Sequence, residues 1–264
     1  MTLSDTKPWW QGSFGYQIYI RSFADSNNDG YGDFQGIRSK IPYLKDLGID
    51  FLWITPFYPS PMADWGYDVA EYCDIDPTFG NLDDFDALVE QAHESGIKIV
   101  ADLVPNHTSD QHKWFKEARK GPENEFRDYY IWKDPAPDGG PPNNWVAYFG
   151  GPAWTFDETS GQYYMHLFLP EQPDLNWRNP KILEEFDQIL RFWLERGVDG
   201  FRIDVAGGLM KDEQFRSNPE ITPWDPEGDR WEQFESFEHR YDIFQKENHE
   251  IFRRWRSIFD EYGA

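Results

Sequence analysis

The feature that most constrains the fold of this chain is a repeated alternation of short apolar segments with longer amphipathic ones. The short segments have the apolar run of a buried strand, and the longer ones carry apolar residues at helical spacing. Such alternation predicts an α/β fold with parallel strands joined by right-handed crossovers. The predicted strands are 16–20, 50–54, 97–103 and 201–204, and the predicted helices are 34–47, 82–95, 180–196 and 231–262, the last with a break near Asp242.

Polar residues that follow the strands favour one of two parallel architectures. Four strand–helix units fit either a doubly wound sheet or part of a (β/α)8 barrel. Barrel sites are built at the carboxyl ends of the strands. We therefore predict a TIM-barrel type fold with about its first four units present, because such polar residues stand just after the strands at Asp64, Tyr67, Asn106, His107 and Asp204.

One long segment interrupts the alternation. Residues 104–180 are rich in Pro, Gly, Asn and Trp, and a loop of this length without structure of its own is unusual. We predict an inserted subdomain after the third strand, with 162–168 as one of its short strands. The predicted organisation is a first part of the barrel over 1–103, the subdomain over 104–179 and the rest of the barrel over 180–264.

Charge and cysteine content limit the partners and the compartment. Lys and Arg number 25 against 48 Asp and Glu, a net charge of −23, which opposes binding to nucleic acid or anionic membranes. A salt-adapted source is an alternative explanation of this charge. We find no apolar run long enough to span a membrane and no secretory signal over 1–10. Because Cys73 is the sole cysteine, we expect no internal disulfide and a cytoplasmic location.

The stretch Gly200-Phe201-Arg202-Ile203-Asp204 is the strongest candidate for chemistry. It places a guanidinium and a carboxylate two residues apart, on the same face of a strand. A carboxylate held ionised at a strand tip is what a glycosidase nucleophile requires. Taken alone, the pentapeptide would be interpreted as a structural ion pair at a strand end.

Four motifs in a fixed order resolve this choice. They are Asp64-Trp65-Gly66-Tyr67-Asp68, Asp102-Leu103-Val104-Pro105-Asn106-His107, Gln172-Pro173-Asp174-Leu175-Asn176 and the stretch that ends at Asp204. Together they make the chain resemble the α-amylase family of glycoside hydrolases, and within it the α-glucosidase and oligo-1,6-glucosidase branch. The resemblance extends from Trp9 onward.

The resemblance implies a retaining α-glucosidase that acts on terminal α-glucosidic bonds of small oligosaccharides. Asp204 would be the nucleophile that forms a glucosyl-enzyme intermediate, and Arg202 would hold it ionised and oriented. Retaining hydrolysis uses a second carboxyl group, the acid/base, roughly 5 Å away across the scissile bond. Trehalose synthase or another transglucosidase of the family, and a non-catalytic binding relative, stay open as alternatives.

The same resemblance assigns a substrate pocket. Its predicted members share a place after a strand or within the inserted subdomain, and they are Asp64, Tyr67, His107, Arg202, Phe149 and Phe168. Without the motifs, His107 would be interpreted as a core histidine, and Asp64 with Tyr67 as a turn carrying a packed aromatic. Relatives carry a larger polar residue at the place of Gly207, so we expect a roomier and less polar leaving-group subsite.

A polar loop near the N-terminus is a candidate metal site. Oxygen-bearing side chains alternate along 25–33, and Ca²⁺ binds such oxygens. Gly36 stands where an EF-hand has a bidentate Glu, so this is not an EF-hand, and an ordinary polar turn is the alternative. The resemblance implies a structural Ca²⁺ bound by Asp25, Asn27, Asp29, Asp33 and the carbonyl of Tyr31.

The resemblance also implies residues that these 264 positions do not supply. The family's general acid is a glutamic acid on a fifth strand, so we expect this chain to be the N-terminal portion of a longer enzyme. On its own it would have little or no activity. A C-terminal half of the barrel supplied by another chain is the less favoured alternative.

Overall fold

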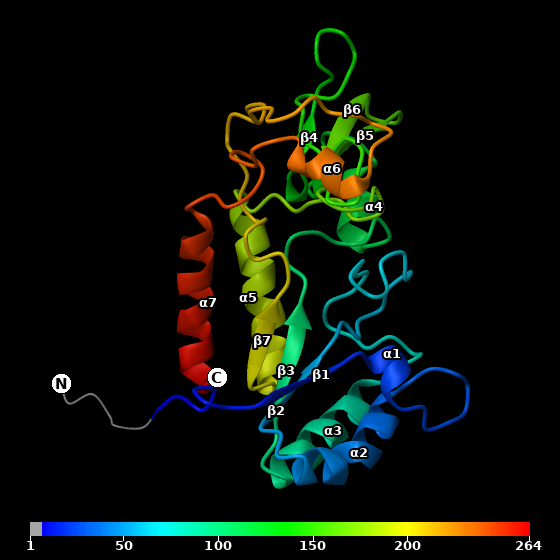
Figure 1. Ribbon diagram of the computed structural model, residues 1–264, viewed down its shortest axis with the longest axis vertical. Helices are drawn as coiled ribbons and strands as arrows, with labels where there is room; N and C mark the ends of the chain where they lie inside the picture. Colours follow the sequence, from blue (N-terminus) through cyan, green and yellow to red (C-terminus); the bar gives the residue numbers. More distant parts are fainter. Residues whose placement is uncertain (1–6) are drawn as a thin grey trace, which may run out of the picture.

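A parallel sheet of four strands forms the centre of the molecule, in the order β1-β2-β3-β7 (Figure 1). The computed structural model describes residues 7–264, so part of the segment in which no secretory signal was found lies outside the described residues. All pairs in the sheet are parallel, which confirms the predicted α/β class. The strands are β1 Gly15–Ile18, β2 Phe51–Ile54, β3 Lys98–Leu103 and β7 Gly200–Ile203.

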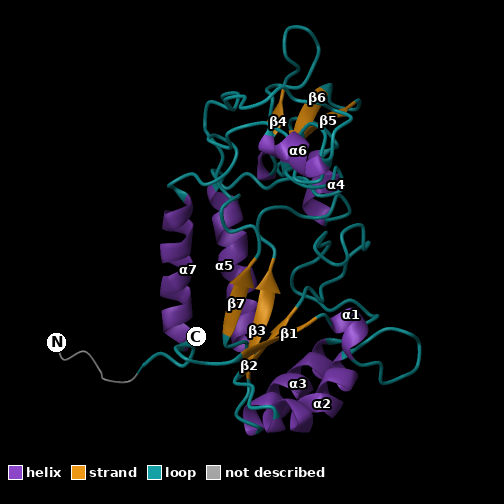
Figure 2. Ribbon diagram, viewed as in Figure 1, coloured by secondary structure: helices purple, strands orange, loops and turns teal. Residues whose placement is uncertain are grey.

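Long helices connect and flank these strands, as Figure 2 shows. Most begin at a side chain that caps the free backbone N–H groups: Asp33 accepts from Gly36 N, Asn81 forms a capping box with Asp84, and Asn179 precedes a first-turn proline. Within residues 7–264 no helix has the length and apolar character needed to cross a membrane. The helices are α2 Phe34–Asp46, α3 Leu82–Glu94, α5 Pro180–Glu195 and α7 Asn248–Tyr262.

Two predicted elements are corrected by the structure. The first strand ends at Ile18, and the one-turn helix α1 Ile20–Phe23 follows, because Ile20 N–H donates to the Thr55 hydroxyl (3.3 Å). The predicted helix 231–262 is two helices, α6 Arg230–Glu235 and α7, separated by a wider break than expected. Between them the Asn218 side chain accepts the N–H groups of residues 240 and 241, both at 3.0 Å, in place of helical bonds.

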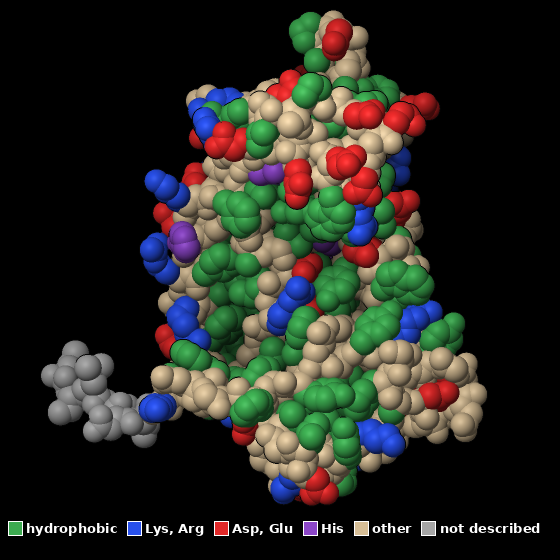
Figure 3. Space-filling model, viewed as in Figure 1, with side chains coloured by type: hydrophobic (Ala, Val, Ile, Leu, Met, Phe, Trp, Pro, Cys, Tyr) green, Lys and Arg blue, Asp and Glu red, His purple; other side chains and the backbone are tan. Residues whose placement is uncertain are grey.

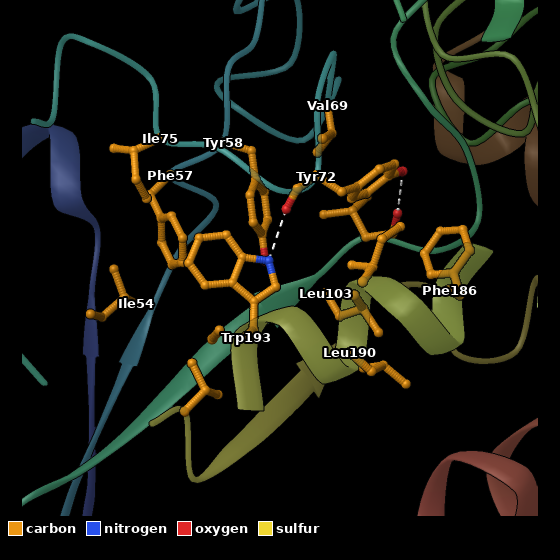
Figure 4. Close-up of a cluster of buried hydrophobic side chains, with 14 of the residues drawn as sticks. Ile54, Phe57, Tyr58, Val69, Tyr72, Ile75, Leu103, Phe186, Leu190 and Trp193 are labelled. Atoms are coloured by element: carbon orange, nitrogen blue, oxygen red, sulfur yellow. Dashed lines mark hydrogen bonds between the residues drawn. The ribbon is translucent and has the colours of Figure 1, made fainter. Parts of the chain in front are cut away.

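Aromatic side chains fill the layer between the sheet and its outer helices (Figure 4). Trp193 of α5 is fully buried, with its ring centroid 5.3 Å from Phe57 and 5.1 Å from Phe85, both edge-on. Its indole N–H donates to the Tyr72 carbonyl at 2.8 Å, so the buried polar atom is satisfied. Burial of each such ring contributes roughly 1.5–3 kcal/mol. This packing fixes the outer face of the sheet and leaves the site residues to the other face.

The inner face of the sheet is open in the part of the chain that the structure describes. Strand residues and Phe259 of α7 border a hollow of about 490 Å³, and its strand lining includes Phe51, Trp53, Val100 and Arg202. In Figure 3 hydrophobic side chains surround a few charged ones near the centre of the visible face. Parallel sheets are normally covered on both faces, and a barrel closes by pairing its edge strands, which here are β1 and β7. The architecture is therefore half of a barrel.

A second, antiparallel sheet lies in the segment between β3 and α5. Its strands β4 Trp132–Lys133, β6 Gln162–Met165 and β5 Trp154–Asp157 are adjacent in that order. The short helices α4 Lys113–Ala118 and η1 Arg127–Tyr129 precede them. The strand predicted over 162–168 ends at Met165, and soon after it the Leu167 N–H donates to the Asp174 carboxylate (2.9 Å) instead of to a neighbouring strand. The boundaries 104–179 for this subdomain stay a prediction.

Candidate active site

Two carboxylates and one guanidinium meet at the carboxyl end of the parallel sheet. Arg202 Nη1 lies 2.6 Å from Asp204 Oδ1 and 3.2 Å from Asp102 Oδ1. Asp102 and Arg202 are register partners on β3 and β7, and Asp204 N–H donates to the Leu103 carbonyl at 2.8 Å. The sheet itself therefore sets the position of the predicted nucleophile, and the ion pair orients its carboxylate.

Asp102 braces this ion pair from the neighbouring strand. Its Oδ2 accepts a hydrogen bond from Trp53 Nε1 at 2.9 Å and one from the Tyr67 hydroxyl at 3.3 Å. Burial raises the pKa of Asp102 to about 7, against the opposing effect of the Arg202 charge. Burial also raises the pKa of Tyr67, so its hydroxyl stays protonated and can donate.

A second group of polar side chains joins the loop after β2 to the end of β3. Gln172 Nε2 donates to Asp64 Oδ2 at 2.9 Å and lies 3.0 Å from His107 Nε2. His107 Nε2 also lies 3.2 Å from the Tyr67 carbonyl. Burial lowers the pKa of His107, which keeps the imidazole neutral, and burial raises the pKa of Asp64. A small set of converging polar groups of this kind suits the hydroxyls of an uncharged ligand.

Aromatic rings from the inserted subdomain border this group. The Phe168 ring centroid lies 5.2 Å from that of His107, and Phe149 packs edge-on against Phe168 at 5.6 Å. Phe149 is 38% exposed, so it lies at the outer rim. Contacts therefore connect all seven residues predicted for catalysis and substrate binding into one region, and their individual roles stay predictions.

Lys211 is a buried cation next to the site that was not predicted from the sequence. Its side chain is 2% exposed, and its ammonium lies 2.7 Å from Asp174 Oδ2 and 3.0 Å from Asn106 Oδ1, with the Gly208 carbonyl as a further acceptor. Asp174 belongs to the inserted subdomain and is fully buried. One buried cation thus joins the loop after β7, the end of β3 and the subdomain. Nothing in the local sequence marks this lysine, because its partners are distant along the chain.

Gln172 stands in one of the four motifs but was not predicted as a site residue. It is fully buried at the centre of the Asp64–His107 contact. Its position as the first residue of a recognised motif is the signal in the sequence that could have identified it as a site residue.

The turn after Asp204 is strained and is covered by an aromatic ring. Val205 has a φ of 49°, which is rare for a β-branched residue and typical of constrained functional sites. A Cβ added at Gly207 would collide with the Phe244 ring. The Phe244 ring occupies the space that the missing side chain would leave at Gly207, and the expectation of a roomier, less polar leaving-group subsite stays a prediction.

The loop predicted to bind Ca²⁺ is folded around its own backbone. Asp25 accepts from the N–H groups of residues 27, 28 and 30, and the Gly30 N–H is the main cause of the lowered pKa of Asp25. Asp29 accepts from Tyr31 N–H, whereas Asp33 caps α2 and accepts from Ser26. Across residues 7–264 no three His, Cys, Asp or Glu side chains converge as metal ligands. The side-chain oxygens of the loop instead accept hydrogen bonds from its own backbone and from Ser26.

This fold and site define the class of protein. A parallel half-barrel that presents carboxylates, an arginine and a neutral histidine at its strand ends has the site architecture of TIM-barrel enzymes, whose active sites lie at that end of the strands. The chain belongs to the α-amylase family, because residues 17–263 match the family described as alpha amylase, catalytic domain.

Individual relatives agree with the branch that the motifs indicated. The chain is 50% identical over 261 residues to an alpha-glucosidase of Culex pipiens, which covers 98% of this chain and 44% of that protein. It is 56% identical over 203 residues to an oligo-1,6-glucosidase of Heyndrickxia coagulans, covering 77% of this chain and 37% of that one. The crystal structure of an alpha-glucosyl transfer enzyme superposes with a TM-score of 0.93 at 46% identity, covering 97% of this chain and 49% of the other. The chain thus spans about half the length of these relatives.

Proposed function

We propose that this chain carries the nucleophile and the glucose pocket of a retaining α-glucosidase that acts on terminal α-glucosidic bonds of small oligosaccharides. The observation that carries the proposal is the Arg202–Asp204 pair, 2.6 Å long, at a strand end that contacts link to Asp64, Gln172 and His107. Relatives named alpha-glucosidase and oligo-1,6-glucosidase support the same substrate class.

In the proposed reaction, a carboxylate oxygen of Asp204 attacks the anomeric carbon of the terminal glucosyl unit. The bond from that carbon to the glycosidic oxygen breaks, and the leaving oxygen takes a proton from a general acid. Water, deprotonated by the same group, then attacks the anomeric carbon and releases Asp204. Asp64 and neutral His107 bind sugar hydroxyls, and the Tyr67 ring stacks on the sugar face.

A transglucosidase is the second candidate. Its first step is identical, but a sugar hydroxyl replaces water in the second. The superposition with an alpha-glucosyl transfer enzyme favours it. A non-catalytic binding relative is disfavoured because Asp204 is present and paired.

The test is covalent labelling with a 2-fluoro glucosyl inhibitor that has an activated leaving group, since such a leaving group reduces the need for a general acid. We expect the label on the peptide that contains Asp204, and none in Asp204→Asn. Label at any other carboxylate contradicts the assignment of the nucleophile. Release of the label by sugars in preference to water favours the transglucosidase.

We also propose that the general acid comes from further polypeptide that covers the open inner face of the sheet. Apolar side chains such as Trp9, Phe51 and Phe259 border that face, and the edge strands β1 and β7 are free to pair within the described range. A polypeptide that corresponds to the part of a relative not matched by this chain should, when added, restore hydrolysis and bury these residues. Full hydrolysis by the 264 residues alone would contradict this proposal.

For the loop at 25–33 we propose a structural Ca²⁺, bound by Asp25, Asn27, Asp29, the Tyr31 carbonyl and Asp33. Support comes from the side-chain oxygens gathered in one exposed turn. Calcium should raise the melting temperature, and Asp29→Ala should abolish that rise. A melting temperature that chelator does not change would contradict the site.

A cytoplasmic location is proposed because Cys73 is a free thiol. Recovery of the native protein from an oxidising compartment would contradict it.

A further inference from the structure

A column of aromatic rings runs outward from the candidate active site. From His107 it passes to Phe168, then to Tyr148 at 5.0 Å with the two ring planes 16° apart. Tyr148 stacks on Phe234 of α6 at 4.2 Å, and Phe234 stacks on His239 at 3.6 Å with the planes 15° apart. The column therefore joins the pocket, the inserted subdomain and the segment between β7 and α7.

The hydrogen bonds of His239, at the outer end of this column, define its protonation state. Its Nδ1 lies 2.6 Å from Asp242 Oδ2, and its Nε2 lies 2.8 Å from the Phe234 carbonyl. A carboxylate and a carbonyl can only accept hydrogen bonds. With Asp242 ionised, both ring nitrogens carry a proton when both bonds form, and the ring is then an imidazolium.

The positive charge of His239 matters because its partner, Asp242, is buried. The Asp242 side chain is 0% exposed and that of His239 is 12% exposed. In the described part of the chain Asp242 Oδ1 has no hydrogen-bond partner, so His239 is the group that compensates the buried carboxylate. The neighbouring Glu238 and Arg240 pair with each other at 2.6 Å.

Two pKa values describe the titratable groups at this end of the ring column. From the inserted subdomain, Tyr148 packs against α6, and burial raises its pKa to about 12. Burial lowers the pKa of His239, but the hydrogen bond to Asp242 and the charge of Asp242 outweigh it, so the pKa lies above the ordinary 6.5.

We propose that His239 is a positioning residue: as an imidazolium between Asp242 and the Phe234 carbonyl, it fixes the outer end of the ring column and so holds Tyr148 and Phe168 in place as one wall of the pocket. The consequence for sugar binding rests on the proposed α-glucosidase function. The bridge is fully formed below the ordinary pKa of histidine and is lost as the pH rises through the raised value, because a neutral ring keeps only one N–H.

The first test is an NMR titration of the histidine side chains in the 264-residue chain. Both ring nitrogens of His239 should be protonated at pH 6.5, and its midpoint should lie above that value. In Asp242→Asn the midpoint should fall. A His239 that is mainly neutral at pH 6.5 in the wild type overturns the proposal, and this result needs no variant to fold.

The second test measures hydrogen exchange of residues 145–150, which report on the pocket wall, and of 230–244. After correction for intrinsic rates, exchange in both segments should accelerate severalfold as the pH passes the His239 midpoint. In His239→Gln it should be fast at every pH, whereas the matched variant His249→Gln, in exposed α7 sequence, should behave as wild type. If exchange at 145–150 changes neither with the pH nor in His239→Gln, the proposal that His239 holds the pocket wall in place is overturned. Neither test involves a sugar, so both outcomes are separate from the labelling of Asp204.

Discussion

Replacement of Lys211 by Met should be among the most destabilising single changes in this molecule. Methionine keeps most of the aliphatic length of the side chain but removes the ammonium that contacts Asp174, Asn106 and the Gly208 carbonyl. The change leaves the Asp174 carboxylate, which is 0% exposed, without its compensating charge. Removal of one partner of a buried ion pair costs about 3–5 kcal/mol. At roughly 2–4 °C per kcal/mol, the melting temperature should fall by about 6–20 °C.

Urea unfolding followed by tryptophan fluorescence and circular dichroism would measure this cost. In the double variant Lys211→Met with Asp174→Asn, the losses should be less than additive, with a coupling energy of about 2 kcal/mol. Lys120→Met is the matched control, because Lys120 pairs with Glu117 at the surface and such exposed pairs contribute little to stability. A loss at Lys211 below about 1 kcal/mol, or strictly additive losses, would refute the reasoning.

Two further predictions concern the strand ends. The pKa of Asp102 is about 7 in the folded protein, whereas the pKa of an unfolded Asp is about 3.9. The folded state therefore holds the proton more tightly, and the free energy of unfolding of the wild type should fall as the pH rises from about 4 to about 7. Asp102→Asn should remove that slope, and denaturation at pH 5 and pH 8 checks it; an equal difference from wild type at both pH values contradicts it. Val205→Asn should raise the free energy of unfolding by about 1 kcal/mol, because Asn tolerates the left-handed φ of 49° better than a β-branched residue does. Any loss of stability at this position in the same urea assay would show that the Val205 contacts outweigh its backbone strain.

The elements that the sequence predicted well are those fixed by local patterns. The helix α5 was predicted to within one residue because its apolar spacing ends just before a glycine at 197, and the structure adds a side-chain cap at Asn179. The length of the break before α7 was underestimated because its causes are not local in the sequence. The Asn218 side chain accepts N–H groups that helical bonds would otherwise use, and Phe237 and Ile243 are buried by tertiary packing although they lie outside any helix. Tertiary contacts of this kind override helical periodicity.

The candidate site was predictable only as far as its residues stand in motifs. Asp204, Arg202 and His107 could be named from the sequence because they lie within recognisable stretches. Lys211 could not, since its meaning arises only when Asn106 and Asp174 are brought to it in space. The ring over Gly207 was missed for the same reason: the absent side chain was visible in the sequence, but Phe244 lies far along the chain.

The pocket contacts also bear on the order in which the chain folds. Gln172 and Asp64 are separated by 108 residues, and Arg202 and Asp102 by 100. Contacts with such long loop closures form slowly, whereas helices form within microseconds. In refolding from urea, formation of these two contacts should therefore lag behind recovery of the helical signal, and a nascent chain cannot form the Arg202–Asp102 pair before residue 202 has left the ribosome.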